Sequence, residues 1–298
     1  MTRAVNNLPP ADLANKVYVV TGANSGIGYA AAENFASRGA ALALVCRSAE
    51  RGTAALTRIR VRTGNMNINL FVADFASLAS VARVAGEINH TYDKIHVLCN
   101  NAGSASASRT LTKDGFETTF AANHLAGFLL TKLLLPKLFI AADQDKARVV
   151  FTSSLGHKNS ALEFDNLNLE QGYSTLKAYG RSKLMNLLTA KELDKRYGEK
   201  KIIASSFHPG AVRTLIWRKS GFLASILGLL MYPFMWSIKK GSDTFIWLAS
   251  SEDEVVLNAA GNYFFDRKQR SIASFASDEA AEQLWRISEE LVQPFEGL

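Results

Sequence analysis

The pair Tyr179 and Lys183 carries the clearest chemical signal in the sequence, because the two residues lie four positions apart. On a helix this spacing directs both side chains to one face. A free phenol has a pKa of about 10, and a fixed cation nearby favours its ionised form and moves that pKa toward neutrality. The spacing therefore predicts an acid-base pair, although a chance pair on a solvated helix surface has the same pattern.

A glycine-rich turn near the N-terminus is the second functional pattern. The apolar run 17–20 predicts a strand before the turn, and an Ala-rich helical stretch follows it. Glycine lets the backbone approach a pyrophosphate closely, and the first N–H groups of the helix attract anions. A dinucleotide phosphate site is expected, and a glycine turn without a ligand is the alternative. The candidate residues, spaced as Gly-x3-Gly-x-Gly, are Gly22, Asn24, Ser25, Gly26, Ile27 and Gly28.

Further motifs lie between the glycine-rich turn and the Tyr179–Lys183 pair and after that pair. Taken together, all these motifs make the chain resemble the short-chain dehydrogenase/reductase family from about Lys16 to its C-terminal helix, and most strongly the retinol-dehydrogenase-like branch. The motifs that carry the resemblance are Cys46-Arg47-Ser48, Asn100-Asn101-Ala102-Gly103, Asn123-His124-Leu125, Ser153-Ser154-Leu155-Gly156-His157 and His208-Pro209-Gly210-Ala211-Val212-Arg213-Thr214.

The resemblance implies a role for each catalytic candidate. Tyr179 would be the general acid when a carbonyl is reduced and the base when an alcohol is oxidised. Lys183 would lower the pKa of Tyr179 and bind the ribose hydroxyls of the nicotinamide nucleotide. Ser154 would hold the substrate oxygen, with Ser153 as the second choice. Asn123 would hold a water that relays protons from Lys183, and a polar helix residue without a role is the alternative.

The cofactor candidates lie after the predicted strands. Arg47 stands nineteen residues beyond Gly28, where an arginine accommodates a 2′-phosphate, so NADP(H) is expected unless Arg47 is a solvated loop residue. By the resemblance, Asp74 would accept from the adenine amine, and a helix N-cap is the alternative. Asn101 and Gly103 would shape the wall beside the adenine ribose. The segment expected beside the nicotinamide, otherwise a plain turn, contains Pro209, Gly210, Val212 and Thr214.

The composition excludes several other classes of protein. The net charge of +7 comes from scattered Lys and Arg without an aromatic-interleaved basic stripe, so nucleic acid is not an expected partner. Five His and two Cys show no spacing typical of a metal site or a disulfide framework, and no G-x-S-x-G elbow supports a hydrolase. The first fifteen residues contain no apolar signal core, so a cytoplasmic location is expected, with or without peripheral membrane association.

Apolar strands alternate with amphipathic helices along the chain, a pattern typical of a parallel sheet covered on both faces. We expect one α/β domain over 1–298, a Rossmann-type, doubly wound and mostly parallel sheet of about seven strands. The expected strands are 16–21, 41–46, 69–73, 96–100, 148–153, 202–207 and 262–265. The expected helices are 26–37, 49–62, 78–89, 116–138, one through Tyr179 to about 196, and one ending near 291.

An apolar segment around 214–240, with its centre at 222–236, follows the sixth predicted strand. Three interpretations remain open: a lid over a lipophilic substrate, a membrane-surface contact flanked by Lys and Arg, and a helix pair packed on the core. The expected function is an NADP(H)-dependent oxidoreductase for a small retinoid-, steroid- or fatty-carbonyl-like substrate, and a homodimer is compatible with it. The alternatives are a catalytically silent cofactor-binding regulatory or scaffold protein and a peripheral membrane lipid-binding protein.

Overall fold

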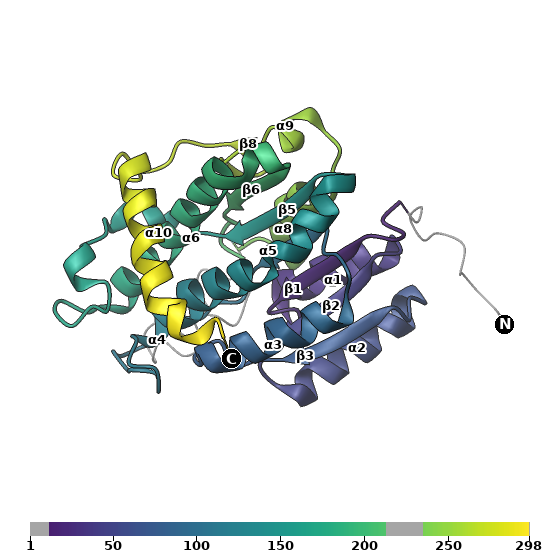
Figure 1. The fold of residues 1–298 in the computed structure, drawn as a ribbon, viewed down its shortest axis with the longest axis horizontal. Helices are drawn as coiled ribbons and strands as arrows, with labels where there is room; N and C mark the ends of the chain where they lie inside the picture. Colours follow the sequence, from purple (N-terminus) through teal and green to yellow (C-terminus); the bar gives the residue numbers. More distant parts are fainter. Residues whose placement is uncertain (1–11, 213–234, 298) are drawn as a thin grey trace.

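A single β-sheet positions the predicted site residues. The computed structural model describes residues 12–212 and 235–297. Within them, eight strands follow the order β3-β2-β1-β4-β5-β6-β7-β8, and all neighbours are parallel except β7 and β8 (Figure 1). The strands are β1 (Val17–Thr21), β2 (Ala41–Cys46), β3 (Ile68–Val72), β4 (Val97–Asn100), β5 (Ala147–Thr152), β6 (Ile202–Phe207), β7 (Tyr263–Phe265) and β8 (Lys268–Gln269).

Helices cover both faces of the sheet, because successive strand residues point to opposite faces and both sets are apolar. One buried cluster lies under α1 (Gly26–Ser37), α2 (Ala49–Thr63) and α8 (Ile238–Ser250). The other lies under α3 (Leu78–Thr91), α5 (Ala126–Gln144), α6 (Thr175–Tyr197) and α10 (Asp278–Val292). Figure 1 shows α10, in yellow, across α6, and the two helices are in direct contact.

The predicted α/β architecture is confirmed, and all seven expected strands form. The eighth strand, β8, has two residues and is too short to produce a periodic signal. The prediction lacked α8. The long helix expected over 116–138 does form, as one helical stretch over Thr118–Gln144. It contains a feature that the prediction lacked, a π-helical turn (Ala121–Leu125) between the short α4 (Thr118–Phe120) and α5.

The stretch Thr118–Gln144 is long and apolar enough to cross a membrane by length and composition alone. However, 67% of its most apolar window is buried inside the fold. It supplies Leu129, Leu130 and Leu134, each 0% exposed, to the cluster shared with α3 and α6. The apolar composition therefore reflects a core helix.

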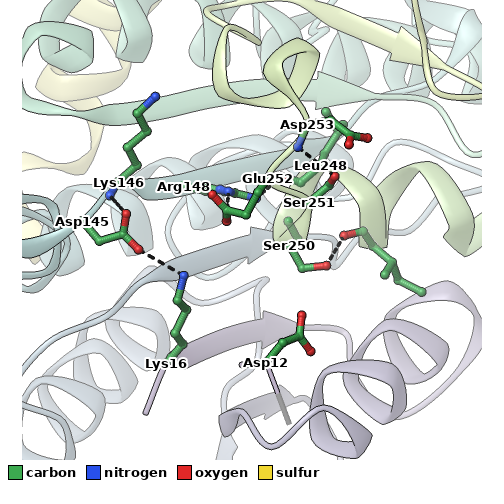
Figure 2. A network of polar contacts seen from close by, with 12 residues as sticks. Asp12, Lys16, Asp145, Lys146, Arg148, Leu248, Ser250, Ser251, Glu252 and Asp253 are labelled. Atoms are coloured by element: carbon green, nitrogen blue, oxygen red, sulfur yellow. Dashed lines mark hydrogen bonds and ion pairs between the residues drawn. The ribbon is translucent and has the colours of Figure 1, made fainter. Parts of the chain in front are cut away.

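Ion pairs connect elements at the amino ends of the central strands (Figure 2). Lys16, just before β1, bonds to Asp145, just before β5, at 3.1 Å. Arg148 in β5 is 5% exposed and reaches Glu252, after α8, at 2.8 Å. Its Nη1 also lies 3.5 Å from the carbonyl of Leu248 near the end of α8, where a cation interacts favourably with the helix dipole.

Candidate active site

The glycine turn after β1 forms a tight cradle. Gly22 has φ +67° and Gly26 has φ +58°, values that favour glycine. A Cβ on Gly28 would lie 2.5 Å from the Gly22 carbonyl oxygen, so only glycine fits there. Ser25 is the N-cap of α1 but makes no side-chain cap bond. The Ser25 side chain therefore does not occupy the first backbone N–H groups of α1, and these groups can donate hydrogen bonds to an anion.

Thr21 and Asn101 hold this turn against β4. The Thr21 hydroxyl donates to the Cys99 carbonyl at 3.1 Å and accepts from the backbone N–H groups of Asn101 and Ala102, both at 2.9 Å. The Asn101 amide donates to the Thr21 carbonyl at 2.9 Å. The position of Asn101 beside the adenine ribose stays a prediction, and in the described structure its amide group also fixes the glycine turn. Sequence reasoning missed Thr21, which marks the end of an otherwise apolar strand.

Ser154, Tyr179 and Lys183 meet at the carboxyl end of β5. Ser154 hydrogen-bonds to Tyr179, and the two residues line one cavity. The Lys183 ammonium lies 5.5 Å from the centre of the Tyr179 ring and donates to the Thr152 carbonyl at 3.0 Å. Ser153, the second choice for the substrate serine, is 1% exposed, and its hydroxyl donates to the Lys183 carbonyl at 2.8 Å. The geometry thus favours Ser154.

Burial controls the charge state of this pair. It raises the pKa of Tyr179 to about 12, and the hydrogen bond from Ser154 opposes this only in part. It lowers the pKa of Lys183 from 10.5 to about 8. The expectation that Lys183 brings the Tyr179 pKa down toward neutrality is therefore wrong for the protein alone, since desolvation has the larger effect.

Asn123 lies in the π-helical turn, a feature that is frequent at functional sites. Its Nδ2 donates to the Ser104 carbonyl and to the Ser182 hydroxyl, both at 2.9 Å, and its Oδ1 accepts from Ser104 N–H at 2.7 Å. A Cβ on Gly103 would lie 3.3 Å from both Asn123 Oδ1 and Lys183 Nζ. Asn123 and Lys183 therefore border the same narrow space, and Oδ1 is the atom of Asn123 that can accept from a water there.

Sequence reasoning also missed the contacts that bring the Ser154 turn onto α6. A Cβ on Gly180 would lie 2.8 Å from the Gly156 carbonyl oxygen, so the glycine after Tyr179 permits close approach. The buried Arg181 donates to the Ala161 carbonyl at 3.1 Å and pairs with Glu163 at 2.6 Å. The only sequence signal for these contacts was the unusual glycine inside a helix.

Two further cofactor candidates are exposed at strand ends. Arg47 follows β2 beside the glycine turn, because Val45 pairs with Thr21. Asp74 is exposed, and its Oδ1 accepts from Ala76 N–H at 3.1 Å. The N-cap of α3 is Ser77, so the cap alternative for Asp74 is wrong.

The segment after β6 is anchored by packing. Gly210 has φ +82°, and a Cβ there would lie 2.9 Å from the Trp236 ring. Pro209 is half-buried, whereas Val212 is 7% exposed and packs against Gly241 of α8, so its side chain belongs to the core. Thr214 and the apolar centre of the predicted lid lie outside the described residues.

A cavity of about 660 Å³ opens in front of Tyr179. Its wall combines polar side chains with a larger share of apolar surface, to which Leu176 contributes. The lining residues are Ser154, Gly156, Asn159, Ser160, Ala161, Glu163, Ser174, Leu176, Lys177 and Tyr179.

These residues fit a nicotinamide dinucleotide. The Gly28 position can take no Cβ, as a pyrophosphate cradle requires. Lys183 is 2% exposed, and its one hydrogen-bond partner among the described residues is the Thr152 carbonyl, although an ammonium has three donors. The glycine turn and the Tyr179–Lys183 pair adjoin through the loop after β4. A Cβ on Gly22 would lie 3.1 Å from Ala102 of this loop, and Gly103 of the same loop borders Lys183.

Known proteins share this sequence over most of its length. A sequence model of the family described as short chain dehydrogenase matches residues 16–221. Retinol dehydrogenase 12 of Mus musculus is 39% identical over 93% of this chain and 86% of its own. A protein of Streptomyces sp. (strain C5), provisionally named daunorubicin C-13 ketoreductase DnrU, is 38% identical over 94% of this chain and 93% of its own.

Solved structures share the fold. An uncharacterized protein from Mycobacterium paratuberculosis superposes with a TM-score of 0.74 at 30% identity, covering 96% of this chain and 98% of that one. The NADP complex of Pseudomonas aeruginosa RhlG gives a TM-score of 0.68 at 23% identity, covering 86% and 96%. The predicted resemblance is confirmed: the chain belongs to the short-chain dehydrogenase family of oxidoreductases, which act on alcohol and carbonyl groups with a nicotinamide dinucleotide.

Proposed function

We propose that the protein interconverts a carbonyl and an alcohol on a small lipophilic molecule, with NADP(H) as its hydride carrier. The observation that carries this proposal is the meeting of Ser154, Tyr179 and Lys183 at the end of β5, next to the loop that borders the glycine turn. Relatives named as retinol dehydrogenases and as a ketoreductase support the reaction class.

Tyr179 moves the proton at the substrate oxygen. With a pKa of about 12 its phenol is protonated near neutrality, so it can donate to a carbonyl that is being reduced. Ser154, hydrogen-bonded to Tyr179, holds the same oxygen. When bound, the nicotinamide supplies or accepts the hydride at carbon. Lys183 would bond to the ribose, and its charge beside the ring stabilises the phenolate that donation leaves.

Tyr179→Phe tests this role, because it removes the transferable proton and keeps the ring. We expect NADPH binding to persist while kcat falls by at least about a hundredfold, the lower end of what general acid-base catalysis contributes. The assay is NADPH oxidation with a panel of apolar aldehydes and ketones. Near-normal turnover by the Phe variant would contradict the proposal. NADPH binding by the unsubstituted protein without turnover on any of them would favour a silent scaffold.

Arg47 is the proposed determinant of cofactor choice, because it is exposed beside the glycine turn and pairs with no carboxylate among the described residues. A guanidinium forms charge-assisted bonds with a 2′-phosphate. Arg47→Asp should therefore reverse the preference from NADPH to NADH. Equal affinity of the unsubstituted protein for both cofactors would contradict this part of the proposal.

A lipophilic substrate is proposed from the apolar composition of 222–236 and from the names of the relatives. If apolar contacts dominate, kcat/KM should rise with the chain length of an aldehyde, since each buried CH₂ contributes about 0.8 kcal/mol. Equal kcat/KM for short and long aldehydes would contradict a lipophilic pocket. We further propose a cytoplasmic protein that contacts membranes through 222–236, which co-sedimentation with anionic vesicles tests.

A further inference from the structure

His157 is tied to the substrate side of the site. It lies in the 3₁₀ turn Leu155–Asn159 directly after Ser154 and is 0% exposed. Its Nδ1 lies 2.7 Å from the Ser154 carbonyl oxygen. A carbonyl only accepts, so Nδ1 carries the proton and donates, and Nε2 of the neutral ring has a lone pair. This bond fixes the backbone that presents the Ser154 hydroxyl, together with Gly156 N–H, which donates to that hydroxyl at 3.2 Å.

His208 is tied to the cofactor side of the site. The Gly210 N–H lies 3.0 Å from His208 Nδ1. A backbone N–H only donates, so here Nδ1 has the lone pair and the proton of the neutral ring sits on Nε2. Burial and the nearby His157 lower the pKa of His208 to about 4, which keeps this ring neutral at pH 7. Its ring stacks on Phe265 at 4.3 Å between centroids, which holds the turn at Gly210.

The two rings share Tyr263 of β7. Its ring centre lies 4.7 Å from that of His157 and 6.4 Å from that of His208. Tyr263 is itself 2% exposed, so one buried ring supports both histidines.

We infer that His157 and His208 are two positioning residues held in opposite tautomers against Tyr263, one fixing the Ser154 hydroxyl and the other fixing the Gly210 turn beside the cofactor. This inference rests on the proposed function for the meaning of the two sides, but the tautomers themselves do not depend on it. The two histidines therefore control different steps. Loss of the His157 bond displaces a catalytic hydroxyl, whereas loss of the His208 bond loosens the cofactor turn.

The hydrogen bonds can be removed and restored one at a time. His157→Leu should lower kcat at least about tenfold at saturating NADPH, because small displacements of reacting groups cost up to about a hundredfold. His208→Leu should instead raise the Kd for NADPH about fivefold, within the range of one lost hydrogen bond. His157→Asn should restore kcat, because its amide NH₂ lies where Nδ1 donates, and His208→Asn should restore the Kd for NADPH, because its amide oxygen lies where Nδ1 accepts. His157→Gln carries its amide one carbon further out and should not restore kcat.

His96 provides the matched control. It is 8% exposed, and its Nδ1 accepts from Val17 N–H at 2.9 Å. It lies just before β4, at the opposite end of the strands. His96→Leu removes a bond of the same type as His208→Leu. It should lower Tm and leave kcat and the Kd for NADPH unchanged.

Side-chain ¹⁵N NMR at pH 7 reads the tautomers without any turnover. We expect the proton on Nδ1 of His157 and on Nε2 of His208. The opposite assignment at either ring would overturn the inference, as would Leu variants that change only Tm, or failure of both Asn variants to rescue. Should His157→Leu not fold, the Asn and Gln variants decide in its place. A protein with both expected tautomers but no carbonyl turnover would contradict the proposed function and leave the histidine arrangement in place.

Discussion

Strand β5 has a buried cation at each end, and the two differ in their partners. At the amino end, Arg148 is 5% exposed and pairs with Glu252 (Figure 2). At the carboxyl end, Lys183 is 2% exposed and bonds to a carbonyl, with no carboxylate paired to it among the described residues. A buried charge without a counter-ion costs stability. The amino end is therefore arranged for stability, whereas the carboxyl end keeps a costly charge at the position of the proposed chemistry.

Replacement of Lys183 by Met should produce the largest change, with opposite signs for activity and stability. Turnover should fall by at least about a hundredfold, because the variant loses the charge beside Tyr179 and a cofactor contact. The free energy of unfolding at pH 7 should rise by about 2 kcal/mol, because the depressed pKa of Lys183 reflects a desolvation cost. Urea titration measures the gain. Lys183→Arg keeps the charge and should show no gain in the free energy of unfolding. A Met variant that is less stable than the unsubstituted protein would contradict the comparison of the two ends of β5.

The pH dependence of stability tests the same charge. The pKa of Lys183 is about 8 in the folded protein and 10.5 ordinarily, so between these values the unfolded chain binds more protons. The free energy of unfolding should therefore rise with pH in this window, by about 2 kcal/mol from this group. The difference between the unsubstituted protein and Lys183→Met isolates the contribution, since the raised pKa values of buried tyrosines affect both proteins. A constant difference from pH 7.5 to 10 would refute it.

Arg148→Met should have the opposite effect on stability from Lys183→Met. It removes the bond to Glu252 and the interaction with the end of α8, so the free energy of unfolding should fall by about 1–2 kcal/mol. Turnover should not change, because β5 places Arg148 far from Ser154 along the strand. Glu252→Gln is the milder control, as Glu252 is 66% exposed. Equal stabilisation by both Met variants would show that pairing does not distinguish the two ends.

The exposed pair of Lys16 and Asp145 should contribute least. Its side chains are 30% and 50% exposed, and exposed pairs are worth about 0.2–1 kcal/mol. Lys16→Ala should lower the free energy of unfolding by less than about 0.5 kcal/mol, and 1 M NaCl should remove the difference. A larger loss that persists in salt would mean that the amino end depends on more than Arg148.

The sequence predicted the sheet well because its strands are short apolar runs with clear turn signals, as in 41–46 and 202–207, whose bounds agree with the structure. Helical spacing also placed Tyr179 and Lys183 on one face, and the family resemblance added Ser154 to them. The functions of Thr21, His157 and Gly180 could not be predicted, because each depends on a contact between elements far apart in sequence. The low pKa of Lys183 and the high pKa of Tyr179 likewise follow from burial, which spacing does not reveal.

The contact of both site histidines with Tyr263 has a consequence for the order in which the protein becomes active during synthesis. Tyr179 and Lys183 leave the ribosome more than seventy residues before Tyr263, which belongs to the last parallel strand. A nascent chain that has emerged only as far as β6 contains every proposed catalytic side chain but not the ring that supports His157 and His208. The support of both histidines is thus complete only after β7 has joined the sheet.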